Sequence, residues 1–408
     1  MLTLFNTDGR KIETFRPVND TVVNVFTCGP SVYQRAHIGN FRTYLFEDVL
    51  VRYLEYLGYT VRRGMNFTDV EDKALDEARA RGMTVKEMTD HNIEEFIDEM
   101  HLLRIKVPDY MARASEAIDG AVEIIETLLD RGIAYWYGGN VYFDPLKFPD
   151  LGKLFGLDMS RWPAKKRRFH KDTYPGMRWN RGDFIIWDGC AAPEDACWRT
   201  KIGSGRPAWN IQDASIIRKH IDETLSIYCG GIDNLIRHHD YSIAILESIR
   251  PYPMARYWLH CHHLFIDGRK MSKSRGNMHY TDTLQNMGFN PAEIRFFLIY
   301  GHYRRRINFT DTAMRKTAEK LRSFTGKMSA IHVMAQSATG SAGTPRGEQL
   351  LNAFTAHMDD DLDIRCAFDS VERLVSEIDV SRISPGEACD VVAALGRIDG
   401  VLQVLDCA

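Results

Sequence analysis

Apolar and polar positions near the start of the chain follow two different periodicities. Residues 21–28 (TVVNVFTC) form a compact β-rich run that stops at Gly29-Pro30, as a buried strand does when it ends in a turn. Residues 40–57 then carry large apolar side chains at helical spacing, and Gly58 follows as a helix-ending residue. A second β-rich run covers 59–66. Strand, helix and strand in this order predict a βαβ unit, and therefore a parallel sheet with a right-handed crossover.

The later pattern predicts an α/β fold that gives way to helices. Helical spacing with alternating charges covers 71–133, and short strands, turns and many aromatic residues cover 134–210. The segments expected after these are a strand at 225–228, a helix at 238–250, a last sheet strand at 257–266 and helices throughout from Pro291.

This pattern divides the chain in two. We expect a Rossmann-like α/β domain at 1–290, into which a helical and connective region at about 71–210 is inserted. A helical bundle domain is expected at 291–408, with a small-residue linker at about 334–347 and a final helical stretch at 348–406.

The composition favours a soluble, cytoplasmic protein, and a monomer is the default expectation. The 408 residues carry a net charge of −3, which argues against a surface that binds polyanions everywhere. The start of the chain lacks a signal-peptide pattern, and no apolar stretch approaches the ~18 residues of a membrane span. The eight cysteines include no CxxC pair, so we expect reduced thiols, with Cys190 and Cys197 as loop thiols.

Two short motifs carry the candidate chemistry. The motif His37-Ile38-Gly39-Asn40 falls at the predicted strand-to-helix junction, where a doubly wound sheet presents its binding crevice. The second motif, Lys270-Met271-Ser272-Lys273-Ser274, lies in the run LFIDGRKMSKSRGN. Two ammonium groups that face a histidine-bearing helix start could hold a triphosphate while a carboxylate attacks its α-phosphorus, because a helix N-terminus favours phosphate.

Several further blocks resemble cysteinyl-tRNA synthetases, in the same order along residues 2 to about 406: TCGPSVYQRAHIGNF, NFTDVEDK, GRPAWNIQDASI, CGGIDNLIRHHDYSI, HYRRRINF and DDDLDIRCAF. The resemblance implies the class I synthetase fold. It also implies an ATP-dependent ligase that forms an aminoacyl-adenylate, with Mg²⁺ accompanying the ATP. In length the chain departs from these enzymes, since it stops about where their anticodon-recognition region would begin. In this respect it resembles mycothiol cysteine ligases, which join cysteine to an amino-sugar.

The resemblance also implies roles at the ATP site. His37 and Asn40 would open the helix, and His37 would donate a hydrogen bond to the triphosphate. Lys270 and Lys273 would neutralise charge that develops on the phosphates. The remaining ATP-binding residues are Gly39, Gly230, Gly231, Met271, Ser272 and Asp233, of which Gly39 would let adenine approach the backbone and Asp233 would bond the ribose. A buried structural histidine and a turn aspartate are the plainer interpretations of His37 and Asp233.

The amino-acid pocket departs from that of the relatives, whose zinc is held by two cysteines, a histidine and a glutamate. Cys28 and His238 match the first cysteine and the histidine, but Asp213 replaces the second cysteine and Ser242 replaces the glutamate. Three interpretations remain open. A metal such as zinc is held by Cys28, Asp213 and His238; or the pocket is polar and holds no metal; or Cys229 supplies a replacement ligand.

Three further residues are expected at this pocket, namely Thr68, Trp209 as a wall, and Tyr228, where the relatives usually have histidine. Core packing is the plainer interpretation of each, as a buried strand cysteine is for Cys28 and a helix N-cap is for Asp213. The basic runs at 164–171 and 303–306 could meet a tRNA acceptor stem or be solvated loops.

These observations favour an ATP-dependent ligase that activates an amino acid and transfers it to an amine or hydroxyl other than tRNA, on a small molecule or a carrier. The ATP motifs are complete, the chain ends before an anticodon region, and the amino-acid pocket is altered. A short cysteinyl-tRNA synthetase, a cysteine:amino-sugar ligase and a catalytically silent regulator are the alternatives. Intact Lys270, Lys273 and His37 speak against the silent regulator.

Overall fold

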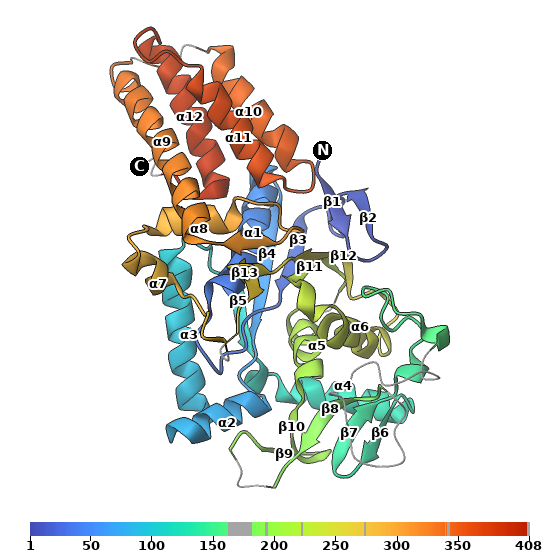
Figure 1. Cartoon of the computed structure of the whole chain (residues 1–408). Helices are drawn as coiled ribbons and strands as arrows, with labels where there is room; N and C mark the ends of the chain where they lie inside the picture. The colour runs from blue at the N-terminus through green and yellow to red at the C-terminus, as the bar shows by residue number, and fades with distance from the viewer. Residues whose placement is uncertain are drawn as a thin grey trace.

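The computed structural model describes residues 1–161, 182–191, 195–221, 223–272, 275–338, 340 and 343–405. The basic run 164–171 and the motif residues Lys273 and Ser274 lie outside these ranges. The molecule is elongated, with a helical bundle (orange to red) standing on an α/β part (Figure 1). Among the described helices, none is both long and apolar enough to cross a membrane.

A five-stranded parallel sheet forms the centre, in the order β12-β11-β3-β4-β5. Its strands are β3 (Val22–Thr27), β4 (Thr60–Phe67), β5 (Tyr110–Arg113), β11 (Leu225–Gly231) and β12 (Ala255–Cys261). Helix α1 (Ile38–Tyr56) connects β3 to β4, as the predicted βαβ unit requires. The direction of strand addition reverses between β3 and β11, so a binding crevice is expected beyond their carboxyl ends.

Two hydrophobic cores cover the two faces of this sheet, which explains why its strands are apolar along their length. On one face α1 packs against α8 (Pro291–Ile299) and α12 (Pro385–Leu402), in a cluster that runs from Val25 to Phe354 in the bundle. On the other face α4 (Ile118–Asp130), α5 (Trp209–His220) and α6 (Asp240–Glu247) surround Phe26 and Trp258.

The remaining elements attach to this framework. Helices α2 (Asp72–Arg81) and α3 (Val85–Leu102) lie between β4 and β5. An antiparallel sheet, in the order β6-β7-β8-β10-β9, consists of β6 (Ala134–Tyr137), β7 (Asn140–Phe143), β8 (Phe184–Gly189), β9 (Trp198–Thr200) and β10 (Gly203–Pro207). A third sheet pairs β13 (Leu264–Ile266) with β14 (Arg269–Lys270) and β15 (Ile307–Phe309), and a hairpin joins β1 (Thr3–Asn6) to β2 (Lys11–Thr14).

The other helices are short turns around the sheets and the long helices of the bundle. The short ones are η1 (Ala114–Glu116), η2 (Pro145–Lys147), η3 (Met159–Arg161), η4 (Ile232–Asn234), the π-helical turn η5 (Leu235–His239) and α7 (Thr281–Asn286). The bundle adds α9 (Asp311–Ala335), α10 (Pro345–Met358) and α11 (Ile364–Ser376) to α12.

The α/β fold with a parallel sheet and C-terminal helices is confirmed. Three segment predictions are wrong in part: β5 interrupts the helices expected at 71–133, the strand expected at 257–266 splits into β12 and β13 in different sheets, and β15 interrupts the helices expected after Pro291. Strands β5, β13 and β15 are only three or four residues long and pair with distant segments, so local periodicity does not mark them. The connection between α9 and α10 is shorter than the linker expected at 334–347, and the domain boundary at residue 290 stays a prediction.

Candidate active site

A cavity of about 360 Å³ lies beyond the carboxyl ends of β3 and β11, where the strand order reverses. The segments that follow β3, β11 and β12 form its wall together with the start of α1. The predicted site residues that line it are Cys28, His37, Gly39, Asn40, Trp209, Gly231, Asp233, Lys270 and Met271. The two sequence motifs, which are more than two hundred residues apart, therefore meet in one cavity.

His37 is the N-cap of α1, and its ring has a defined hydrogen-bonding arrangement. The ring Nδ1 accepts hydrogen bonds from the backbone N–H groups of Gly39 (3.1 Å) and Asn40 (3.2 Å). Burial lowers the pKa of His37 to about 4, so the ring is neutral near pH 7. Because Nδ1 is an acceptor, the single ring proton must reside on Nε2. His37 therefore presents one N–H donor beyond its cap contacts.

The side chain of Asn40 completes this cap, and the missing side chain of Gly39 leaves room for Met271 beside the His37 ring. Asn40 Oδ1 accepts a hydrogen bond of 3.0 Å from the backbone N–H of His37, which makes a reciprocal capping box. A Cβ at Gly39 would lie only 2.4 Å from the terminal methyl of Met271 and 3.0 Å from the His37 ring. The close approach of the second motif to the helix start thus depends on a residue without a side chain.

Lys270 and Asp233 form an ion pair at the mouth of the cavity. Lys270 Nζ lies 3.3 Å from Asp233 Oδ2, and both side chains are about half exposed, at 54% and 53%. Pairing of β14 with β13 brings Lys270 here, opposite Phe265, while Asp233 belongs to η4 just after β11. The backbone N–H of Ser272, the last described residue before Lys273, donates a hydrogen bond of 3.0 Å to Asn277 Oδ1.

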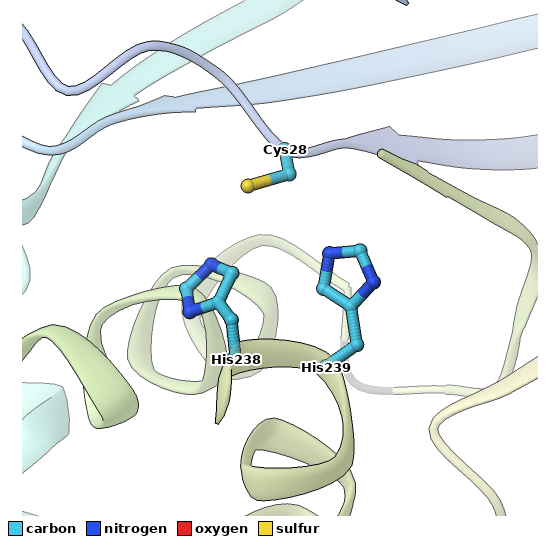
Figure 2. Close-up of side chains that lie close together, drawn as sticks. All are labelled: Cys28, His238 and His239. Carbon is cyan, nitrogen blue, oxygen red and sulfur yellow. The ribbon is translucent and has the colours of Figure 1, made fainter. Parts of the chain in front are cut away.

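At the other end of the cavity, Cys28, His238 and His239 form a buried cluster (Figure 2). One potential ligand atom from each lies within 4.8 Å of the other two. A ring nitrogen of each histidine points toward Cys28 Sγ (Figure 2). Burial, with Asp213 and Glu47 nearby, raises the pKa of the Cys28 thiol well above its ordinary value. Without a cation beside it, Cys28 is therefore a neutral thiol.

Asp213 lies beside this cluster and is held from two sides. The Tyr228 hydroxyl donates a hydrogen bond to Asp213 Oδ2. The same oxygen lies 2.9 Å from His238 Nε2, and all three side chains are fully buried. Trp209 stacks on the His238 ring with centroids 4.3 Å apart and planes 5° from parallel. Trp209 thus joins the cavity wall to the histidine behind it.

Two interpretations from the sequence, one of Asp213 and one of Cys229, are wrong. Asp213 is not a helix N-cap, because α5 already begins at Trp209 and its N-cap is Ala208. Cys229 cannot replace a ligand at this cluster, because it faces the core of α1 on the opposite side of the sheet. Its neighbour Tyr228 faces the side of Cys28, as the alternation of a strand requires.

Six of the predicted residues do not line the cavity, namely Asp213, Ser272, Thr68, Gly230, Tyr228 and His238. Thr68 is buried, and its backbone exchanges hydrogen bonds with the loop after β3, through Pro30 O and the Val32 N–H (both 3.1 Å). Gly230 packs so closely on His239 that a Cβ there would lie 2.6 Å from the imidazole. Tyr228 supports Asp213, and His238 belongs to the buried cluster.

Arg35, Lys73 and His239 are among the residues of the site that were not predicted from the sequence. Arg35 and Lys73 line the cavity, and both lie in quoted motif blocks from which they were not singled out. His239 was missed because consecutive side chains of an α-helix diverge by about 100°. Here the segment is the π-helical turn η5, and both His238 and His239 reach Cys28. Such turns are rare in proteins, and those that occur often lie at functional sites.

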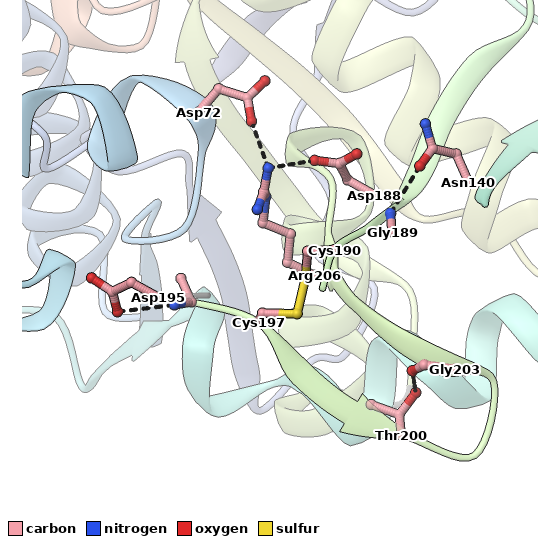
Figure 3. Close-up of a disulfide and its surroundings, with 11 residues drawn as sticks. Asp72, Asn140, Asp188, Gly189, Cys190, Asp195, Cys197, Thr200, Gly203 and Arg206 are labelled. Atoms are coloured by element: carbon pink, nitrogen blue, oxygen red, sulfur yellow. Dashed lines mark hydrogen bonds and ion pairs between the residues drawn. A yellow bond between two sulfur atoms is a disulfide. The ribbon is translucent and has the colours of Figure 1, made fainter. Parts of the chain in front are cut away.

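The expectation that Cys190 and Cys197 are unpaired thiols is wrong, because they form a disulfide (Figure 3). Gly189 at the end of β8 and Trp198 at the start of β9 both pair with Gly205 of β10, from opposite sides. The cysteines follow and precede these two residues, so the sheet register brings them together, with Cα atoms 6.1 Å apart. The six residues between Cys190 and Cys197 in the sequence did not by themselves indicate this disulfide.

Comparison with known proteins gives clear relatives. The family model for the tRNA synthetases class I (C) catalytic domain matches residues 14–319. The cysteine–tRNA ligase of Chlamydia pneumoniae is 36% identical over 418 residues, covering 99% of this chain and 86% of the relative. The cysteine–tRNA ligase of Chlamydia muridarum is 37% identical over 429 residues, covering 99% and 88%.

Solved structures share the fold at low sequence identity. The methionyl-tRNA synthetase of Mycobacterium tuberculosis bound by methionyl-adenylate has a TM-score of 0.66 and 14% identity, covering 95% of this chain and 92% of that one. A LeuRS of Agrobacterium radiobacter K84 in a ternary complex with tRNA and LeuAMS has a TM-score of 0.67 and 11% identity, covering 95% and 85%. At these identities the likeness shows the fold alone.

Proposed function

The chain belongs to the class I (C) tRNA synthetase catalytic-domain family and is an ATP-dependent ligase, and from this premise we propose that it activates an amino acid as an aminoacyl-adenylate and transfers the acyl group to an amine or hydroxyl other than tRNA. The observation that carries the activation step is the meeting of His37, Lys270 and Asp233 in one cavity at the helix start.

Each of these groups suits one part of ATP. The Nε2–H of His37 and the backbone donors at the start of α1 favour the triphosphate. Lys270, together with Lys273, supplies positive charge where negative charge develops on the phosphates. Asp233 can accept hydrogen bonds from the ribose hydroxyls. ATP would arrive with Mg²⁺, whose charge offsets part of that on the triphosphate.

The reaction needs no nucleophilic side chain. The substrate carboxylate oxygen attacks the α-phosphorus, its bond to that phosphorus forms, and the bond to the bridging oxygen breaks, so pyrophosphate leaves and aminoacyl-adenylate remains. An amine or hydroxyl then attacks the acyl carbon, loses its proton, and displaces AMP. The protein's contribution is to hold the reacting groups and stabilise charge.

Support for an acceptor other than tRNA comes from the amino-acid pocket. Asp213 and Ser242 stand where the relatives' pattern has cysteine and glutamate. Selection against serine is a strict requirement when the product enters protein synthesis, and a changed thiol pocket alters that selection. The second candidate is loading of cysteine onto tRNA, which the similarity to cysteine–tRNA ligases over 99% of the chain favours.

Pyrophosphate exchange into ATP, measured with each of the twenty amino acids, tests the activation step. Exchange that depends on one or a few amino acids is expected, and absence of exchange with all of them would contradict it. Adding tRNA to the activated mixture then separates the acceptors. Stable aminoacyl-tRNA would refute the non-tRNA acceptor, whereas adenylate that is consumed only by added amines or alcohols would support it.

A further inference from the structure

We infer that Arg35 is a positioning residue, which holds the segment after the second motif against the start of α1 so that Lys270 and His37 meet in one cavity. The inference deepens the proposed function and rests on it, since it takes Lys270 to act on the phosphates of ATP. Arg35 belongs to the loop between β3 and α1, two residues before His37, and it lines the cavity.

The two terminal nitrogens of Arg35 each hold a carboxylate from another element. Nη1 donates to Asp282 Oδ2 at 2.5 Å, and Nη2 donates to Glu99 Oε1 at 2.7 Å. Asp282 lies in the first turn of α7, just after the second motif, and Glu99 lies near the end of α3. The guanidinium carbon also lies over the Tyr280 ring, 5.2 Å from its centroid. One side chain thus joins the loop before α1 to α3 and to the start of α7.

Glu99 makes a second connection to the same segment. It is buried, and its Oε1 accepts hydrogen bonds from both Arg35 and the Thr281 hydroxyl. Burial raises the pKa of Glu99, and these two hydrogen bonds act against that rise. The hydrogen bond from Arg35 lowers the pKa of Asp282, which is half exposed. Loss of Arg35 would therefore take a donor from a buried carboxylate, which costs more than the loss of an exposed pair.

The backbone of this segment is tied to the start of α1 as well. The N–H of Ile38 donates to His279 O at 3.0 Å. One hydrogen bond fixes the distance between two points of the chain and leaves the direction of the chain weakly determined. The contacts of Arg35 with Tyr280 and Asp282, which follow directly, supply that direction.

Asn277 connects the segment to the second motif. Its Oδ1 accepts a hydrogen bond of 3.0 Å from the backbone N–H of Ser272, and its Nδ2 donates to Lys270 O at 3.4 Å. Asn277 precedes His279 by two residues, so a displacement of the segment would carry Lys270 with it. Because misplacing a reacting group by about 1 Å can cost roughly a hundredfold in rate, a residue that acts through Lys270 can have a large effect.

Pyrophosphate exchange by Arg35→Leu tests the role. We expect kcat/KM for ATP to fall roughly ten- to a hundredfold, whereas KM for the amino acid stays near the wild-type value, because the variant displaces a phosphate-binding group. The matched control is Arg113→Leu, which removes a similarly exposed arginine that pairs with Asp90 of the same helix α3. This control should keep both wild-type values. Wild-type kcat/KM for ATP in a folded Arg35→Leu protein would overturn the inference.

Asp282→Asn separates positioning from direct contact with ATP. If Arg35 acts through Asp282, this variant should also lower kcat/KM for ATP, and the double variant should lose no more than Arg35→Leu alone. If Arg35 instead contacts the phosphates, loss of its carboxylate partner would leave kcat/KM for ATP unchanged or raised, or the two losses would multiply. Any of these results would overturn the inference. Because Asp282 is half exposed, Asp282→Asn should fold even where Arg35→Leu does not.

Limited proteolysis tests the anchoring without turnover. Arg269, Lys270 and Arg275 lie in or beside the second motif and are exposed. Trypsin should cleave there severalfold faster in Arg35→Leu and Asp282→Asn than in the wild type and Arg113→Leu, because a loosened segment opens more often. Equal cleavage rates would overturn the inference. A wild type that supports no exchange with any amino acid would refute the proposed function instead, and the cleavage rates would still decide whether Arg35 anchors the segment.

Discussion

His37 combines two roles that different substitutions should separate. Its Nδ1 caps α1, and its Nε2–H is the donor proposed for the triphosphate. In His37→Asn the amide oxygen can take the place of Nδ1, but no donor reaches the position of Nε2. In His37→Ala both are lost. The first variant therefore keeps the cap and loses the catalytic contact.

The magnitudes follow from the contacts at the start of α1. Loss of a capping side chain costs about 1 kcal/mol, within a range of about 0.5–2. The hydrogen bond from the His37 backbone to Asn40 survives in either variant, so no larger loss is expected. Asparagine is among the best N-caps, so His37→Asn should unfold within about 0.5 kcal/mol of wild type. A lost donor to the reacting phosphates costs about 3 kcal/mol of barrier, or roughly a hundredfold in rate.

Denaturant unfolding and pyrophosphate exchange should be measured on both variants. Exchange should fall roughly a hundredfold in both, while only His37→Ala loses stability. Near wild-type exchange in His37→Asn would refute the role of Nε2–H. Equal destabilisation of the two variants would refute the capping argument, because it would show that the ring packs rather than caps.

Three further outcomes are expected. Lys270→Met should lower exchange roughly a hundredfold at little cost in stability, whereas Lys86→Met, which removes an exposed ion pair away from the cavity, should change neither quantity. Burial lowers the pKa of His37 from 6.5 to about 4, so its contribution to stability is present above pH 6.5 and is lost as the pH falls through 4. Between these two pH values, the free energy of unfolding should therefore depend less on pH in His37→Asn than in the wild type. An equal pH dependence in the two proteins would contradict this. Arg295→Met should cost about 3–5 kcal/mol in the free energy of unfolding, because it removes the 2.5 Å partner of buried Asp48, which keeps Arg52 at 2.9 Å, and strips three backbone carbonyl groups of their donor. The exposed Arg315→Met control should cost under about 0.5 kcal/mol, and similar values for the two variants would contradict the buried-pair argument.

Local signals in the sequence were enough to predict the central fold. The apolar run at 21–28, the helical spacing at 40–57 and the run at 59–66 became β3, α1 and β4 with boundaries displaced by one or two residues. The same unit placed His37 at a helix start beside the sheet edge. These features depend on residues close in sequence, where periodicity and capping preferences act directly.

Features that depend on distant pairing were not predictable in this way. The disulfide depends on the register of β8 and β9 against β10, which the spacing of Cys190 and Cys197 does not encode. His239 joins Cys28 only because η5 is a π-helical turn and because His260 and Thr7, from other elements, hold its ring. A single sequence gives no measure of such three-dimensional neighbours.

The ion pair at the mouth of the cavity joins Lys270 and Asp233, the two groups proposed to bind the phosphates and the ribose of ATP. On that proposal, a bound triphosphate would attract the Lys270 ammonium, and the Asp233 carboxylate would then be released to bond the ribose. A nucleoside that lacks phosphates must displace the ammonium unaided. Each added phosphate should thus improve contacts at both ends of the ligand. Measured affinities for adenosine, AMP and ATP should rise in that order.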